Sequence, residues 1–348
     1  MHQINFLKIV KLAWQAYDES RKILTIEDIS AKVSTNHVYR ITFEGNLSII
    51  GKLSYFGRHE HFIEDHTIIN SLSNNLPSPY AHFLSRSLIK GNELFVHRYV
   101  DSVIDAWVVF YRPIKIKHKL PKRLKEPQIR KLGAEMAAFH KACHLIRNTL
   151  PSSSKNLHTD IAHLLEIVDS EFGSYEHRGR EAIIHKQSNL LFENLEKYDF
   201  HKLPKIPVFV DWNIGNFSVT KSFKLYSRWD YDWFRMSARI MDFYFLSRVV
   251  SDVGDRTIFT YNIGPLMEDR FVLFLKAYHA VFPLTKNEIL LLKEIYRFFI
   301  LNYVIKDGRY FFHEIYASKL QQQAYASYFD SIENEFDGEK LWQLITNE

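Results

Sequence analysis

The hydrophobic pattern of this chain of 348 residues changes its period along the sequence. In the first hundred residues, apolar side chains alternate with polar ones in short runs, which is typical of strands. From Gln128 onward they recur at helical spacing, interrupted by a short strand-like stretch at 208–229. We therefore expect an α+β protein, with a small sheet-rich lobe at residues 1–100 and a larger helical lobe at 101–348.

The first lobe is predicted to hold an opening amphipathic helix, three strands, a second helix and two further strands. The second helix covers Glu60 to Leu72, and Glu44-Gly45-Asn46 forms a hairpin turn. The strands are expected at residues 29–33, 38–43, 47–53, 83–88 and 94–99. This order predicts a five-stranded antiparallel sheet.

The second lobe is predicted to be built mainly from helices. A capping box, Thr285-Lys-Asn-Glu288, precedes one of them, because its threonine and glutamate satisfy amide groups at a helix start. The expected helices are at residues 132–144, 160–172, 180–198, 290–305 and 309–336.

Composition limits the class of protein. With 46% apolar residues the chain can bury a large core, and a single cysteine, Cys143, rules out an internal disulfide and favours a reducing compartment. Cys143 lies in an apolar helical pattern and is interpreted as a buried, inert thiol. No apolar run reaches the ~18 residues that a membrane-spanning helix needs. We expect a cytoplasmic protein with no membrane partner.

The net charge of +5 is concentrated at residues 112–131, where nine Lys or Arg residues face a single acidic residue, Glu126. Such a block is compatible with an anionic substrate, a nucleic acid or a membrane face. Three prolines interrupt it, and we interpret it as a solvated loop without specific nucleic-acid binding.

Three polar residues in the strand-like stretch have the chemistry of a metal-dependent transfer site. Asp211 precedes Asn216 by five positions, and a short hairpin after Asn216 returns to Asp230. Such a hairpin brings Asn216 and Asp230 together, and carboxylate and amide oxygens are ligands that Mg²⁺ prefers. Asp211 is then placed to accept the proton of an attacking hydroxyl, as phosphoryl transfer requires.

These residues resemble motifs of the aminoglycoside phosphotransferase and choline kinase family, which are relatives of protein kinases. Asp211-x-x-x-x-Asn216 resembles the end of the catalytic loop, and Trp229-Asp230-Tyr231 resembles the metal-binding segment. Further matching stretches are Asn36-His-Val-Tyr-Arg-Ile, Ile50-Gly-Lys-Leu, Leu132-Gly-Ala-Glu-Met-Ala-Ala-Phe-His140 and Arg239-Ile-Met-Asp242. The resemblance covers roughly residues 28 to 250 and implies a two-lobed, protein-kinase-like fold with ATP and Mg²⁺ as cofactors.

The resemblance also implies roles for individual residues. Lys52 corresponds to the lysine that grips the nucleotide phosphates, with Glu64 as its partner on the following helix, although Asp65 and Glu60 also fit. Asn36 opens the strand after the nucleotide loop. His97 and Tyr99 lie in the stretch assigned to the hinge that binds adenine. Asp242 is expected to be structural, accepting backbone N–H bonds from the catalytic loop.

Two features depart from the family pattern. Phe209 stands where the family has a histidine that packs against the catalytic loop and bonds its backbone, and the loop Val33-Ser-Thr-Asn-His37 lacks glycine. The first departure motivates a second interpretation, a nucleotide-binding pseudokinase that acts as a scaffold. A third is binding of RNA or an anionic surface through residues 112–131. Retention of Asp211, Asn216 and Asp230 together favours an active kinase.

The acceptor is a small-molecule alcohol that the sequence does not identify. Helices after residue 155 and beyond 250 are expected to form its pocket. A polycationic aminoglycoside is disfavoured by the net basic charge, whereas sugars, amino alcohols, homoserine-like compounds and nucleosides stay open. Aromatic residues near the site, Trp212 among them, are compatible with a cation-binding box, but we favour core packing. The oligomeric state cannot be predicted.

Overall fold

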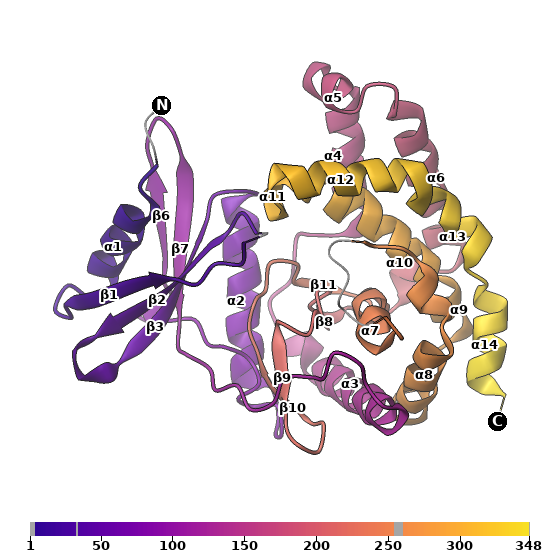
Figure 1. The fold of residues 1–348 in the computed structure, drawn as a ribbon, viewed down its shortest axis with the longest axis horizontal. Coiled ribbons are helices and arrows are strands. Elements are labelled where there is room, and N and C mark those ends of the chain that lie inside the picture. The colour runs from indigo at the N-terminus through magenta and orange to yellow at the C-terminus, as the bar shows by residue number, and fades with distance from the viewer. Residues whose placement is uncertain (1–3, 33, 254–259, 348) are drawn as a thin grey trace.

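Five antiparallel strands form one sheet in the first third of the chain (Figure 1). The computed structural model describes residues 4–32, 34–253 and 260–347. The order of the strands across the sheet is β1-β2-β3-β7-β6. Their bounds are β1 (Ile23–Asp28), β2 (His37–Phe43), β3 (Ser48–Ser54), β6 (Val96–Val100) and β7 (Asp105–Tyr111). A separate two-stranded hairpin, β4 (Ile89–Lys90) and β5 (Glu93–Leu94), precedes β6.

Two helices flank this sheet (Figure 1). Helix α1 (Phe6–Tyr17) packs on one face, where Trp14 meets Phe110 at a ring distance of 5.4 Å. Helix α2 (His59–Asn75) lies between the sheet and the larger lobe. Along β7, Trp107 contacts α2 while Phe110 contacts α1, because neighbouring side chains of a strand point to opposite faces. The interior strand β7 is therefore buried on both sides.

The larger lobe is mainly helical and carries two short two-stranded sheets, β9–β10 and β8–β11. Its strands are β8 (Ile206–Val208), β9 (Phe217–Val219), β10 (Leu225–Arg228) and β11 (Arg235–Ser237). Its α-helices are α3 (Glu126–Ile146), α4 (Leu157–Asp169), α5 (Glu171–Glu176), α6 (Glu181–Lys197), α7 (Phe243–Val250), α8 (Asp269–Val281), α9 (Lys286–Leu290), α10 (Leu292–Phe299), α11 (Gly308–Phe311), α12 (Glu314–Gln323), α13 (Phe329–Glu335) and α14 (Gly338–Thr346).

Most of the expected elements are confirmed, with breaks in the longer helices. The 160–172 helix ends at Asp169, and Ser170 caps the next one by accepting a bond from the amide of Gly173 at 3.1 Å. The capping box at Thr285 is present, and Cys143 is fully buried. Wide, π-type turns interrupt the last two predicted helices at Ile300–Lys306 and Ala324–Tyr328.

Two predicted strands are wrong. The first strand is Ile23–Asp28 instead of 29–33; Val33 itself lies outside the described residues. That strand is at the sheet edge with mostly exposed side chains, so its hydrophobic signal is weak. The stretch 83–88 makes only isolated bridges, such as Ser87 with Tyr111. The missing fifth strand is β7, so the sheet extends to Tyr111 and the boundary expected at residue 100 divides a hairpin.

Across the described ranges, no helix combines the length and the apolar character that a membrane crossing requires.

Candidate active site

The predicted transfer residues meet at one end of the β9–β10 hairpin. Asp211 lies in the loop after β8, and its carboxylate accepts bonds from the side-chain amide of Asn216 at 2.9 Å and from the backbone amide of Asn213 at 3.1 Å. The backbone amide of Trp229 donates to the carbonyl of Asn216 at 3.0 Å, and Asp230 follows directly. The hairpin therefore brings Asp211, Asn216 and Asp230 together, as the spacing predicts.

A buried carboxylate fixes the loop that carries Asp211. One oxygen of Asp242 accepts the backbone amides of Phe209 at 2.9 Å and Val210 at 2.7 Å. Its other oxygen lies 2.9 Å from His140 Nε2, and the second ring nitrogen of His140 lies 2.7 Å from the Tyr278 hydroxyl. Val210 is held at a φ of 59°, a conformation that is unfavourable for a β-branched residue. The structural role expected of Asp242 is confirmed.

An arginine beneath the loop was not identified from the sequence. Arg228 is fully buried, and its guanidinium lies 4.4 Å from the ring centroids of both Phe209 and Trp212. It donates to the backbone carbonyl of Asp211 at 2.8 Å. Burial lowers the pKa of Arg228, partly opposed by the charge of nearby Asp211. Trp212 is fully buried, so it belongs to the core and not to a box that contacts a substrate.

Lys52 pairs with two aspartates of the larger lobe. Its ammonium lies 3.1 Å from Asp230 and also contacts Asp232, which accepts a bond from the Asn36 amide at 2.8 Å. Burial by itself lowers the pKa of Lys52, but the two carboxylates raise it overall. Burial raises the pKa of Asp232 to about 6, while Lys52 holds the pKa of Asp230 below its usual value.

Glu64 is not the partner of Lys52. Its carboxylate accepts bonds from the Ser153 hydroxyl at 2.6 Å and the Ser154 amide at 2.8 Å, both in the larger lobe. The next residue, Asp65, pairs with Lys155 at 2.6 Å. Glu64 and Asp65 of α2 are therefore directed at the loop before α4, which corrects the predicted pair of Lys52 and Glu64.

The structure places His97 and Tyr99 away from the connection between the two lobes. His97 and Tyr99 lie on β6 at the edge of the sheet, where the Tyr99 hydroxyl bonds Asp101 at 2.9 Å. The chain crosses to the larger lobe only after β7, through residues 112–125. There His118 exchanges two backbone bonds with Val219 of β9, at 3.1 and 2.9 Å. The assignment of His97 and Tyr99 to the hinge is therefore wrong, because β7 lies between them and the larger lobe along the chain.

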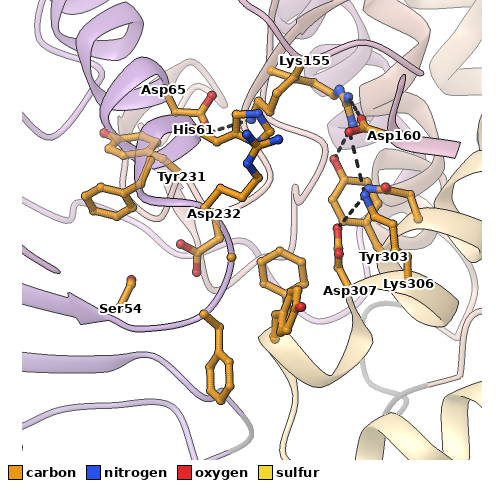
Figure 2. Close-up of a pocket in the computed structure, with 18 of the residues that line it drawn as sticks. Ser54, His61, Asp65, Lys155, Asp160, Tyr231, Asp232, Tyr303, Lys306 and Asp307 are labelled. Atoms are coloured by element: carbon orange, nitrogen blue, oxygen red, sulfur yellow. Dashed lines mark hydrogen bonds and ion pairs between the residues drawn. The ribbon is translucent and has the colours of Figure 1, made fainter. Parts of the chain in front are cut away.

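A cavity of about 480 Å³ lies between α2, the start of α4 and the segment 302–311 (Figure 2). Asn36 and Asp232 connect it to the site described above, whereas Asp211 does not line it. The loop before β2 rests on the same segment, since Ser34 bridges Phe312 and the Thr35 amide donates to the Phe311 carbonyl at 3.4 Å. The cavity is lined from the two helical regions predicted to form the acceptor pocket.

Comparison with solved structures identifies the fold as that of small-molecule phosphotransferases. Amicoumacin kinase, in complex with AMP-PNP, Ca²⁺ and Ami, matches 98% of this chain and 100% of its own, with a TM-score of 0.61 and 14% identity. The microcompartment-associated aminopropanol kinase matches over 94% and 98%, with a TM-score of 0.62 and 14% identity. Spectinomycin phosphotransferase, in complex with ADP and spectinomycin, matches over 99% of both chains, with a TM-score of 0.51 and 14% identity.

The two-lobed α+β fold expected from the resemblance is thereby confirmed. No protein-family model matches the chain, and no curated protein matches it significantly. At this level of identity the comparison concerns the fold.

Proposed function

We propose that this protein is an ATP- and Mg²⁺-dependent kinase that phosphorylates a hydroxyl group of a small molecule. The observation that carries the proposal is the contact of Asp211 with Asn216 next to Asp230, on a loop that Asp242 fixes from below. Solved structures of the same fold include kinases bound to AMP-PNP with Ca²⁺, to ADP and to GDP, which supports the choice of cofactors.

In this proposal, Asp211 orients the acceptor hydroxyl and takes its proton. Asn216 and Asp230 hold Mg²⁺, which neutralises charge on the transferred phosphates. The two side chains fit the ion because they are hard oxygen donors on adjacent strand ends, and about two fifths of the Asp230 side chain is exposed. The described residues contain no group of three or more His, Cys, Asp or Glu suited to a metal.

Nucleotide contacts follow from the positions of the remaining residues. Lys52 is proposed to exchange part of its contact with Asp230 and Asp232 for the phosphates. Asn36 holds the nucleotide loop near Asp232. We place the adenine against backbone groups of residues 112–115, since this stretch follows β7 and leads into the larger lobe.

The pseudokinase scaffold is the second candidate, and Phe209 is the observation that favours it. The loop that carries Asp211 lacks the histidine that supports it in the family pattern. In this chain Arg228 supplies a bond to the backbone of residue 211 and stacks on Phe209, so a support is present in another form. We therefore favour the active kinase.

Binding of Mg²⁺–ATP is expected to raise the melting temperature, because a ligand that binds only the native state stabilises it by about 2.7 kcal/mol at a hundredfold excess over Kd. Asp230→Ala should lose most of this shift, since it removes the carboxylate ligand. Asp105→Ala, which removes an exposed carboxylate from the sheet, is the matched control. Differential scanning fluorimetry measures both. No shift in the wild type, or an equal shift in Asp230→Ala, contradicts the assignment.

The basic segment 112–131 is expected not to bind RNA specifically. Part of it is structurally occupied: Leu120 and Leu124 are buried, and the Lys117 ammonium lies 4.1 Å from the Tyr226 ring centroid. Filter binding at several salt concentrations tests this, with the triple charge reversal of Lys115, Lys117 and Lys119 to glutamate as comparison. Salt-sensitive, sub-micromolar binding that the reversal abolishes would overturn the prediction.

A further inference from the structure

Most of the charges that line the cavity beside Asp232 are engaged in ion pairs. Four carboxylates line it among the described residues (Figure 2). Three of them contact a cation of the same wall, and the fourth, Asp232, contacts Lys52, which does not line the cavity and also pairs with Asp230. The pairs are Asp65 with Lys155 at 2.6 Å, Asp307 with Lys306 at 3.4 Å, Asp160 with Arg235, and Asp232 with Lys52. Apart from Arg58, which is exposed, the charged groups of the wall are therefore already engaged when a ligand with a net charge enters.

Other titratable groups add little charge to the interior. Burial lowers the pKa of His61, which keeps its imidazole neutral near pH 7. Arg58 and His163 also line the cavity, but both are exposed, so solvent and salt screen them. Inside the cavity, the field therefore comes mainly from paired charges.

The walls nevertheless have strong capacity for hydrogen bonds. Paired carboxylates keep lone pairs and paired ammonium groups keep protons, because each pair uses only some of them. Three wall residues also hold a buried polar atom with no partner among the described residues: Asp65 Oδ1, Asn302 Oδ1 and Arg235 Nε. All three residues are at least nine-tenths buried. Unsatisfied buried groups are costly, so this wall suits a ligand that both donates and accepts bonds.

Aromatic rings form the other part of the lining. The rings of Phe56 and Tyr310 stack at 5.7 Å, and those of Phe62 and Trp107 lie 5.9 Å apart. Ring faces pack well against C–H surfaces. A compound with hydroxyl groups at its edges and C–H groups on its faces would match both kinds of wall.

We propose that this cavity binds an uncharged polyhydroxylated compound of monosaccharide size, and that this compound is the phosphoryl acceptor, with one hydroxyl group extending past Asp232 toward Asp211. The assignment of this compound as the acceptor rests on the proposed kinase function, whereas its binding in the cavity does not. Hydroxyl groups are both donors and acceptors, so they satisfy the ion-paired wall without adding a charge to it.

Matched pyranoses that differ in charge test the proposal. The probes are D-glucose, D-glucosamine and D-glucuronate, with the corresponding galactose and mannose series because the stereochemistry is not assigned. Binding is measured by saturation-transfer NMR on the chain of 348 residues, with and without Mg²⁺ and AMP-PNP. We expect the neutral member of at least one series to bind about tenfold tighter than either charged counterpart, a difference that one unfavourable charge readily produces.

A charge variant locates the binding. Asn302→Asp keeps the shape of the side chain and adds one negative charge to the ion-paired wall. It is expected to shift preference toward the amino sugar by about tenfold. Asn75→Asp is the control: it adds the same charge at the exposed end of α2, away from the cavity lining. It should leave the preference between neutral and amino sugars unchanged. Unaltered preference in Asn302→Asp would overturn the proposal.

The remaining outcomes separate the two proposals. If no neutral sugar binds, or if a charged member binds tightest wherever binding occurs, the inference about the cavity is overturned even when Mg²⁺–ATP stabilises the protein. If a neutral sugar binds at the cavity but is never phosphorylated, the cavity inference stands, and its assignment as acceptor site fails together with the kinase function for that sugar.

Discussion

Replacement of Asp211 by asparagine is expected to reduce phosphoryl transfer by about 10²–10⁴-fold, the usual contribution of a general base. Asparagine keeps the size and shape of the side chain and can still meet Asn213, but it does not accept the proton of the attacking hydroxyl. Binding of Mg²⁺–ATP should be retained because Asn216 and Asp230 are unchanged. The rate is measured as ADP release with an acceptor found in a screen of metabolite alcohols.

Asp105→Asn, a change of the same kind at a partly exposed carboxylate that pairs with Arg98 in the sheet, serves as the control and should keep the wild-type rate. Equal phosphorylation of a confirmed acceptor by the Asp211→Asn variant would remove Asp211 from its proposed role. Tight binding of ATP without turnover in a broad screen would instead favour the pseudokinase scaffold.

Replacement of Asp242 by alanine is expected to lower the free energy of unfolding by about 3–5 kcal/mol, as breaking a buried polar network does. Asp242 is fully buried, and its removal leaves the amides of Phe209 and Val210 and the ring of His140 without their acceptor. Urea denaturation measures the loss.

Asp101→Ala is a matched control, because Asp101 also accepts two backbone amides, those of Val103 at 2.7 Å and Ile104 at 2.9 Å, but in an exposed turn. We expect it to cost about 1 kcal/mol or less, since water replaces the lost partner. Similar losses in the two variants would mean that Asp242 does not stabilise the loop through its buried bonds.

The fold could be predicted where periodicity and local turns determine it. The hairpin of β2 and β3, the opening helix and the order of sheet before helices are all visible in the sequence. Strand β7 was missed because both of its faces are buried, which removes the alternation that marks a strand. Without β7, the predicted lobe boundary falls at residue 100, and the predicted hinge falls on His97 and Tyr99.

The site could be predicted where its residues are close along the chain. Asp211, Asn216 and Asp230 are joined by one loop and one hairpin, so spacing alone brings them together. The partners of Lys52 depend on how the two lobes meet, and Glu64, Asp65 and Glu60 offered equivalent choices on one helix. Helix α2 faces the loop at Ser153 and Lys155, about ninety positions away, and no local pattern indicates this.

The stacking of Arg228 on Phe209 has a consequence for how this sequence is compared with others. When this sequence is aligned with the family pattern, Phe209 in place of a histidine and Arg228 are scored as two separate differences. In the molecule these two side chains are one unit, because the guanidinium covers the ring and bonds the backbone two residues further on. A histidine introduced at 209 alone would lie against the buried guanidinium of Arg228, so the two positions are best compared as a pair.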